Sequence, residues 1–506
     1  MGVLSNLEPQ SVFYFFEEIT KIPHGSGNMD QISNYLVDFA KERNLFYIQD
    51  AIKNVIIIKE ATPGYENEPA IILQGHMDMV AVKKPDYDID MLTEGLKVAV
   101  DGDRIYAEGT SLGGDDGIAV AYALAILDSD TLKHPRLEVV ITVDEEVGLD
   151  GAREIDLSML TSHRLLNLDS EEEGIFLTSC AGGARVGCHI PVSQTVTEGV
   201  AVEVTVGGLL GGHSGAEIHK ERGNSNALMG RLLWKMTQQI PVAIHTIGGG
   251  LADNAIPRET KAVLVVTESD KSLLAEIVNT VDAELKAEYA TKDPDVFVSV
   301  KELGCGSYDC VTVEDAKRAA AFLWSLPNGV QAMSADMPGL VETSLNMGIL
   351  ELAEGEDTEE GADKNSADTE TAASGENAAK LCAEFSVRSS VESSKYALIA
   401  QLSAITTLAG GTISMTGEYP GWKYRVDSPL RDKMVALYQK MYGEKPRVEA
   451  IHAGLECGLL GSKIEDLDCV SFGPNMSDIH TTEETLSISS TARVWEYLVN
   501  LLAERG

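Results

Sequence analysis

Hydrophobic and polar positions along the chain follow two periodicities in turn, which predicts alternating helices and strands. Apolar residues recur at helical spacing over 8–20, 30–43 and 117–127. Short runs rich in Val, Ile and Leu between these segments predict buried strands, at 55–59, 70–74, 137–143 and 165–168. Strands that are apolar on both faces and separated by helices indicate a mostly parallel sheet with helices on both faces.

The pattern changes from about residue 183. The next segments read strand, helix, strand, strand, helix, strand, at 200–206, 224–238, 242–248, 258–267, 271–289 and 296–302. A similar series of helices and strands follows, at 313–325, 341–351, 380–388, 391–407 and 411–417. This order predicts an α+β region of two ferredoxin-like halves in tandem, the second sharing or lacking its first strand.

After Tyr419 the first pattern resumes, with helices at 428–442, 453–460 and from 488, and strands at 446–451 and 468–472. We therefore expect an α/β domain formed by 1–182 and 419–506, interrupted by an inserted domain at 183–418. Residues 351–379 hold about ten acids and one lysine, without an aromatic residue. Such a segment cannot bury enough apolar surface to order itself, which predicts an acidic disordered loop between two strands.

Composition narrows the functional classes. The formal net charge of −39, with no basic stripe, argues against a nucleic-acid partner. No run of eighteen apolar residues and no secretory signal pattern are present, so we expect a cytoplasmic protein that does not cross a membrane. The seven cysteines form no C-x-x-C pair, which fits reduced thiols in the cytosol.

Candidate chemistry lies at the ends of the predicted strands. His76 and Asp78 follow the strand at 70–74 and, being two apart, point to the same side of extended backbone. Asp115 belongs to G-G-D-D-G (113–117), where the acids could instead cap a helix. Glu145 and Glu146 belong to D-E-E at the end of the strand at 137–143, where an exposed charge cluster is the alternative.

Two further motifs complete the set. Asp169 ends the strand at 165–168, and His480 follows the strand at 468–472. Imidazole with carboxylate suits zinc, and shared carboxylates permit a two-metal site. A salt-bridge network would need basic partners, and the motifs contain none.

Together the motifs resemble the M20 family of di-zinc peptidases, and within it the aminoacyl-histidine dipeptidase (Xaa-His dipeptidase) branch. H-M-D, G-G-D-D-G, D-E-E-x-G, N-L-D-S-E and D-I-H carry the resemblance, with GGHSGAEIHKERGNSNA (211–227), NAIPRE (254–259) and HAGLECG (452–458). They occur in order over nearly the whole chain. The resemblance implies a zinc-peptidase-like α/β domain with an inserted lid domain.

The resemblance also implies roles for the strand-end residues. His76, Asp115 and Asp169 would hold one zinc ion, and Asp115, Glu146 and His480 the other, so that Asp115 bridges two zinc ions per chain. Cobalt or manganese could substitute. Asp78 would fix the tautomer of His76. Glu145 would be the general base for a zinc-activated water.

Other matched residues would bind substrate. By resemblance, His213 in G-G-H-S-G is the lid histidine that helps stabilise the oxyanion. Asn254 and Arg388 would grip the C-terminal carboxylate of the substrate. His452 or Glu456 would meet its amino end.

The expected function is metal-dependent hydrolysis of dipeptides, of Xaa-His type or broader, with a short peptide as the binding partner. The alternatives are an M20-type tripeptidase or N-acyl-amino-acid deacylase, and a non-catalytic metal- or peptide-binding protein. The last would be expected to lack a base or a ligand, and all candidates are present. Homodimerisation is left open by the sequence, with His213 expected to serve the active site of its own chain.

Overall fold

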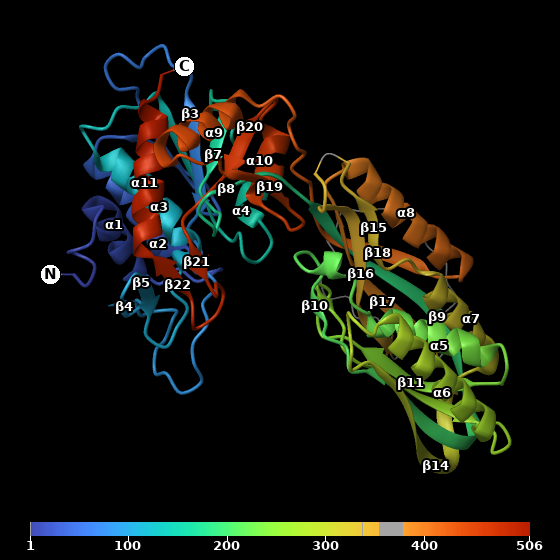
Figure 1. Cartoon of the computed structure of the whole chain (residues 1–506). Helices are drawn as coiled ribbons and strands as arrows, with labels where there is room; N and C mark the ends of the chain where they lie inside the picture. The colour runs from blue at the N-terminus through green and yellow to red at the C-terminus, as the bar shows by residue number, and fades with distance from the viewer. Residues whose placement is uncertain (1, 336, 354–377, 506) are drawn as a thin grey trace. The chain divides into compact units, whose positions relative to one another are not determined.

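The computed structural model describes residues 2–335, 337–353 and 378–505. The chain forms two compact units, one of Met1–Cys180 with Trp422–Gly506 (unit 1) and one of Ala181–Gly421 (unit 2). Both are drawn in Figure 1. Among the described helices, none has the length and apolar character needed to cross a membrane.

Unit 1 is built on an eight-stranded sheet in the order β1-β2-β6-β3-β7-β20-β8-β19. Its strands are β1 (Phe46–Gln49), β2 (Val55–Lys59), β3 (Ile71–His76), β6 (Leu137–Thr142), β7 (Arg164–Asn167), β8 (Ile175–Cys180), β19 (Arg447–Ile451) and β20 (Asp468–Ser471). β3 pairs in parallel with both β6 and β7, and β20 with β7. The carboxyl ends of these four strands therefore meet at one edge of the sheet.

Helices cover both faces of this sheet (Figure 1). One face packs on α1 (Gln10–Thr20), α2 (Asp30–Glu42), α3 (Gly114–Asp128), α9 (Pro429–Tyr442) and α11 (Ile488–Ala503) in a single apolar core. The helices α4 (Asp150–Glu154) and α10 (Glu456–Lys463) contact each other away from that core. The strands β3 and β6 are buried throughout, as their runs rich in Val, Ile and Leu predicted.

A second, four-stranded sheet in unit 1 has the order β21-β22-β5-β4. It joins β4 (Val98–Asp101) and β5 (Arg104–Ala107) to β21 (Met476–Ser477) and β22 (Thr485–Ser487). The sequence pattern did not predict these short strands. The loop between β21 and β22 carries His480, so this sheet fixes the base of that loop.

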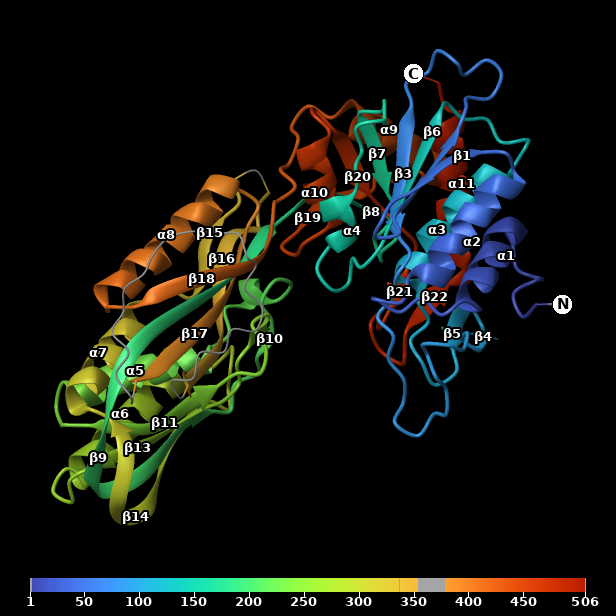
Figure 2. The same ribbon diagram turned by 180° about the vertical axis from the view of Figure 1, so that it is seen from behind.

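Unit 2 is organised around one strand, β9 (Gly182–Gly207), which runs through both halves of its sheet (Figure 2). The carboxyl half of β9 lies between β13 (Thr260–Val266) and β14 (Phe297–Val311). Its amino half lies between β17 (Ala378–Ser389) and β18 (Thr412–Tyr419). With β11 (Ala243–Gly249) beside β13 and β16 (Val341–Ala353) beside β17, each half has the strand order of a ferredoxin-like fold.

The helices α5 (Ser225–Thr237), α6 (Lys271–Glu288), α7 (Val313–Ser325) and α8 (Glu392–Leu408) share one apolar core with this sheet. The remaining elements of unit 2 are short: β10 (Gly212–His213), β12 (Ala255–Ile256), β15 (Gly329–Met333) and a 3₁₀ turn at Ile218–Lys220.

The predicted fold class is confirmed: an α/β sheet with helices on both faces and an inserted α+β part of two ferredoxin-like halves that share a strand. The strand expected at 200–206 was too short, because β9 begins at Gly182. The acidic loop expected at 351–379 was too long, since 351–353 end β16 and 378–379 begin β17. Residues 354–377 lie outside the described part of the chain.

Candidate metal centre and substrate-binding residues

All five predicted metal ligands lie in unit 1, at the carboxyl edge of its large sheet. His76 is the last residue of β3, and Asp169 follows β7. Asp115 lies at the start of α3, where it and Asp116 depart from helical dihedral angles. Glu146 follows β6, and His480 lies between β21 and β22.

Asp115 is placed between two imidazoles. Its Oδ1 lies 3.2 Å from Nε2 of His76 and its Oδ2 lies 3.1 Å from Nε2 of His480. Each oxygen of one carboxylate therefore faces a different histidine, the arrangement expected of a carboxylate that bridges two metal ions.

A further carboxylate stands beside each histidine. Oδ1 of Asp169 lies 3.6 Å from Nε2 of His76, and Oε1 of Glu146 lies 2.9 Å from Nε2 of His480. Asp115, Glu146 and His480 offer donor atoms within 4.8 Å of one another. His76 forms similar groups with Asp116 and Asp169, and with Glu145 and Glu146. The fold thus brings nitrogen and oxygen donors together in three overlapping groups. One of them is a predicted ligand set, Asp115 with Glu146 and His480, whereas Asp116 stands in place of Asp115 in the group with His76 and Asp169.

The electrostatics of the cluster show a deficit of positive charge. Burial, with the charges of Asp115 and Glu146, raises the pKa of Asp169 to about 7 against the opposing effect of His76. Hydrogen bonds to Asp115 and Glu146 raise the pKa of His480 to about 10. Burial lowers the pKa of His76, but the surrounding aspartates outweigh it and hold that pKa well above the usual value. Buried carboxylates in such number fit a site that binds divalent cations.

Asp78 links several parts of this site. Nδ1 of His76, the ring nitrogen opposite the one that faces Asp115, lies 3.0 Å from the backbone carbonyl oxygen of Asp78 and 3.4 Å from its carboxylate. The carboxylate is the part of Asp78 with further partners. It also accepts hydrogen bonds from the backbone N–H groups of Glu145 (3.1 Å) and Glu146 (3.4 Å) and from the hydroxyl of Ser26 (2.9 Å). Asp78 therefore orients the histidine ring through its backbone carbonyl oxygen and its carboxylate, and the carboxylate also holds the loop that carries both glutamates.

Asp116 was not singled out from the sequence, although it stands beside Asp115. It is fully buried, and its Oδ2 accepts a hydrogen bond from the backbone N–H of His76 at 3.2 Å. Burial, with the charge of Asp169, holds its pKa well above the usual value. Gly75 makes this approach possible, because a Cβ there would overlap the Asp116 carboxylate.

Glu171 and Glu484 were also missed. Burial and the charge of Asp115 raise the pKa of Glu171 to about 7. Glu171 stands two residues after Asp169, and Glu484 stands four residues after His480. Their signals in the sequence were this closeness to a candidate ligand and, for Glu171, its place at the end of N-L-D-S-E.

The two candidates for the amino end of the substrate also lie in unit 1. His452 is buried and follows β19. Glu456 is fully buried at the start of α10, where its Oε2 accepts hydrogen bonds from Gln74 and, at 2.7 Å, from the hydroxyl of Thr142. These bonds tie Glu456 to strands β3 and β6, and its contact with a substrate stays a prediction.

The other three candidates lie in unit 2. Arg388, in β17, is buried and donates from Nη1 to the hydroxyl of Tyr419 at 3.0 Å. Asn254 precedes β12, and its backbone carbonyl oxygen accepts from the backbone N–H of Ser214 at 2.8 Å. Burial, followed by the charge of the nearby Arg388, lowers the pKa of His213.

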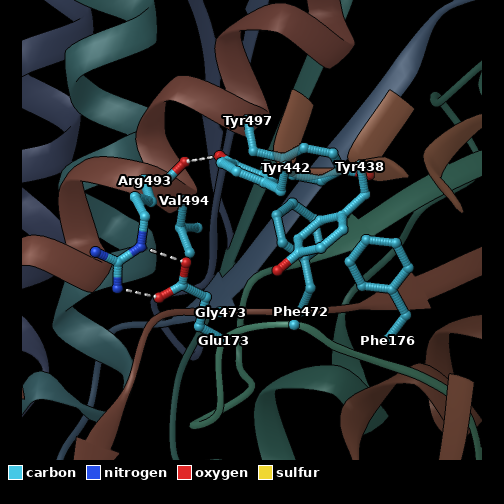
Figure 3. A pocket seen from close by; sticks show the side chains of 10 residues that line it. Glu173, Phe176, Tyr438, Tyr442, Phe472, Gly473, Arg493, Val494 and Tyr497 are labelled. Atoms are coloured by element: carbon cyan, nitrogen blue, oxygen red, sulfur yellow. Dashed lines mark hydrogen bonds and ion pairs between the residues drawn. The ribbon is translucent and has the colours of Figure 1, made fainter. Parts of the chain in front are cut away.

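A separate hollow in unit 1 is lined by aromatic rings (Figure 3). Phe176, Tyr438 and Tyr497 pack there edge to face or tilted. Its two charged residues form an ion pair, in which Glu173 accepts from Nε and Nη2 of Arg493 at 2.6 Å each. This hollow is a packing feature, and its ion pair anchors the segment that follows Asp169.

The chain is similar to known proteins over its full length. A model described as peptidase family M20/M25/M40 matches residues 72–504. The cytosol non-specific dipeptidase of Escherichia coli (strain K12) is 34% identical over 506 residues, which are 100% of this chain and 99% of that protein.

Solved structures of peptidases also resemble this chain. The crystal structure of aminoacylhistidine dipeptidase from Vibrio alginolyticus has a TM-score of 0.87 and 34% identity, and the match covers 100% of this chain and 98% of the other. A Staphylococcus aureus tripeptidase, with a TM-score of 0.56 and 15% identity over 99% of each chain, shares the fold. The resemblance inferred from the motifs is confirmed: the chain belongs to peptidase family M20/M25/M40.

Proposed function

We propose that this protein is a dipeptidase that uses two zinc ions per chain, with cobalt or manganese as substitutes. The placement of Asp115 carries the proposal, because its two carboxylate oxygens face His76 and His480 separately. His76, Asp115 and Asp169 would hold one ion, and Asp115, Glu146 and His480 the other. Bound there, the ions would supply Lewis acidity toward the scissile carbonyl and the attacking water.

In this proposal the proton moves through Glu145. The Asp78 carboxylate accepts from the backbone N–H groups of Glu145 and Glu146 and so holds the loop that carries them. Burial holds the pKa of the Glu145 carboxyl well above its usual value, as suits a group that accepts a proton from water and passes it to the leaving amine. Asp78 keeps the His76 ring oriented throughout.

Residues of unit 2 would bind the substrate backbone. Arg388 carries a fixed positive charge that suits the C-terminal carboxylate of a dipeptide, with Asn254 as a second donor. Nδ1 of His213 accepts from the N–H groups of Gly215 (3.2 Å) and Ala216 (3.1 Å), so the ring proton lies on Nε2. The lowered pKa of His213 keeps this ring neutral at pH 7, and a neutral Nε2–H can donate to a developing oxyanion.

Dipeptides are the substrate class that the relatives support. The two relatives that match the full length at 34% identity are both named as dipeptidases. The tripeptidase, at 15% identity, supports the fold alone, so neither it nor a deacylase is favoured. The name of the Escherichia coli relative and seven free cysteines also support a cytoplasmic location. Homodimerisation stays open, as the sequence left it.

Metal removal tests the proposal. Dialysis against a chelator should abolish hydrolysis of a dipeptide, and repletion with zinc, cobalt or manganese should restore it. Metal analysis of the active protein should give close to two ions per chain. Full activity in metal-free protein would overturn the proposal.

A panel of substrates tests the specificity. We expect kcat/KM to be highest for dipeptides when Xaa-His and other dipeptides, tripeptides and N-acyl amino acids are compared.

A further inference from the structure

Glu484 lies against the turn that carries Asp115. It is 3% exposed. Its Oε2 accepts from the backbone N–H groups of Leu112 (2.8 Å) and Gly113 (3.1 Å). Its Oε1 accepts from those of Gly114 (2.8 Å) and Asp115 (3.4 Å). A single carboxylate thus binds four successive backbone donors, which form an anion-binding nest.

These bonds explain why Asp115 is available for other chemistry. The N–H groups at a helix start need acceptors, and an aspartate there commonly supplies one as a cap. Here α3 has no side-chain cap of its own. Gly113 has φ of 68°, in the left-handed region, which turns its N–H toward Glu484 with those of its neighbours. Glu484 takes the place of the cap.

The same residue belongs to the loop that carries His480. The loop runs from β21 to β22, with Glu484 at its end and His480 in its middle. His480 has φ of 62° and Asp478 of 55°, left-handed conformations that non-glycine residues adopt only where contacts hold them. The bonds of Glu484 therefore join the His480 loop to the Asp115 turn, and Nε2 of His480 lies 3.1 Å from Oδ2 of Asp115.

We propose that Glu484 is a positioning residue that sets the distance between the bridging carboxylate of Asp115 and the imidazole of His480. This inference rests on the proposed metal site but names a residue outside its ligands. Without the carboxylate of Glu484, four N–H donors lose their shared acceptor and both ligands gain freedom. Residues that orient ligands in this way typically contribute 10- to 100-fold to metal affinity.

The test compares Glu484→Gln with Glu483→Gln. The matched control removes the same charge one residue earlier, where the exposed Glu483 carboxylate forms an ion pair with Lys84 at 2.7 Å and accepts from the Thr482 hydroxyl at 3.5 Å. Cobalt binding to metal-free protein is measured against a competing chelator, together with the visible absorption spectrum of the bound cobalt. Glu484→Gln should weaken the binding of at least one ion by about 10- to 100-fold and alter the spectrum. Glu484→Asp, which keeps the charge, should fall between the wild type and Glu484→Gln.

Kinetics at saturating metal give a second readout. Glu484→Gln should lower kcat with little change in KM, because Glu484 positions reacting groups rather than substrate. Wild-type affinity and spectrum in Glu484→Gln, or equal losses in Glu483→Gln, would overturn the inference.

Amide hydrogen exchange in the wild-type protein tests the inference without any variant, and so also if the variants do not fold. The bonds of Glu484 need no metal, so the amides of Leu112, Gly113 and Gly114 should exchange slowly in metal-free protein. Fast exchange of all three would overturn the inference whatever the variants do. If the wild type bound no divalent ion, the proposed function would fail, and slow exchange would still show the link between turn and loop.

Discussion

Among single residues, the carboxylates around the metal centre are told apart by their partners. Asp115 is shared by two imidazoles, Asp78 accepts backbone N–H groups, and Glu484 accepts four of them. Asp116 accepts one, from His76. Carboxylates of the same chemistry therefore have different roles, because the fold places different hydrogen-bond donors beside each of them.

The roles of Glu145 and Glu146 can be separated by isosteric changes. Glu145→Gln should keep both metal ions and lose about 10²–10⁴ in kcat, the usual scale of a positioned proton acceptor. Glu146→Gln should weaken metal binding instead, since Glu146 contacts His480 at 2.9 Å. Metal analysis and kcat on both variants check this. Loss of metal in the first and retention in the second would reverse the two roles.

Much of this site could be predicted from the sequence because its ligands follow apolar strands. An acid or histidine at the end of a buried strand, or within two residues of it, indicates its own position at the sheet edge, as for His76 and Asp169. Glu484 gave no such signal, because its four donors lie about 370 residues earlier in the chain. Which carboxylate meets which N–H is decided by tertiary packing, and periodicity does not contain it.

Among elements, the contact between β3 and α3 brings Asp116 to the metal centre. Gly75 lies where the two elements meet, and a Cβ there would lie 2.6 Å from that of Ala119 and closer still to the Asp116 carboxylate. The helix cannot approach the strand so closely if residue 75 has a side chain.

Gly75→Ala should therefore lower the free energy of unfolding by about 1–3 kcal/mol, the usual cost of overfilling a packed core. It should also weaken metal binding by moving Asp116 and His76. Gly461→Ala is the matched control, because Gly461 lies in α10, where an added Cβ would meet no atom within 4 Å, and alanine favours helix. Denaturant unfolding measures the stability of both variants, and metal titration measures their metal binding. Equal stability of Gly75→Ala and wild type would contradict the packing argument.

Element boundaries were less predictable than element types. The amino half of β9 places Ala184, Val186 and Ile190 in the core of unit 2, an alternation typical of a strand. Polar residues interrupt the pattern at Gln194–Glu198, so the sequence indicated only the carboxyl half. Pairing with β14 across this polar stretch keeps the strand continuous in the structure.

For the whole molecule, the two residues of unit 1 that flank the inserted unit 2 are neighbours in space. Cys180 and Trp422, both in unit 1, exchange two backbone hydrogen bonds of 3.0 Å as an antiparallel bridge. Such a pair can be joined by a short turn.

A chain in which a four-residue Gly- and Asn-containing turn replaces 182–420 should therefore fold as unit 1 alone. It should melt cooperatively and bind divalent ions, since all five ligand candidates lie in unit 1. It should not hydrolyse dipeptides, because Arg388, Asn254 and His213 are removed. Circular dichroism, metal titration and a peptidase assay check the three expectations. A chain without cooperative unfolding would show that unit 1 depends on unit 2.

The single strand β9 also restricts how unit 2 can change in evolution. Even-numbered residues face the helices in both halves, from Ala184 to Val192 and again from Val200 to Val206. Because side chains alternate with a period of two, inserting one residue at the midpoint of the strand would turn one half inside out relative to the other, whereas inserting two would preserve the alternation. Lineages of this protein should therefore differ in length at the middle of β9 by even numbers of residues, a parity rule that two ferredoxin-like folds joined by a loop would not obey.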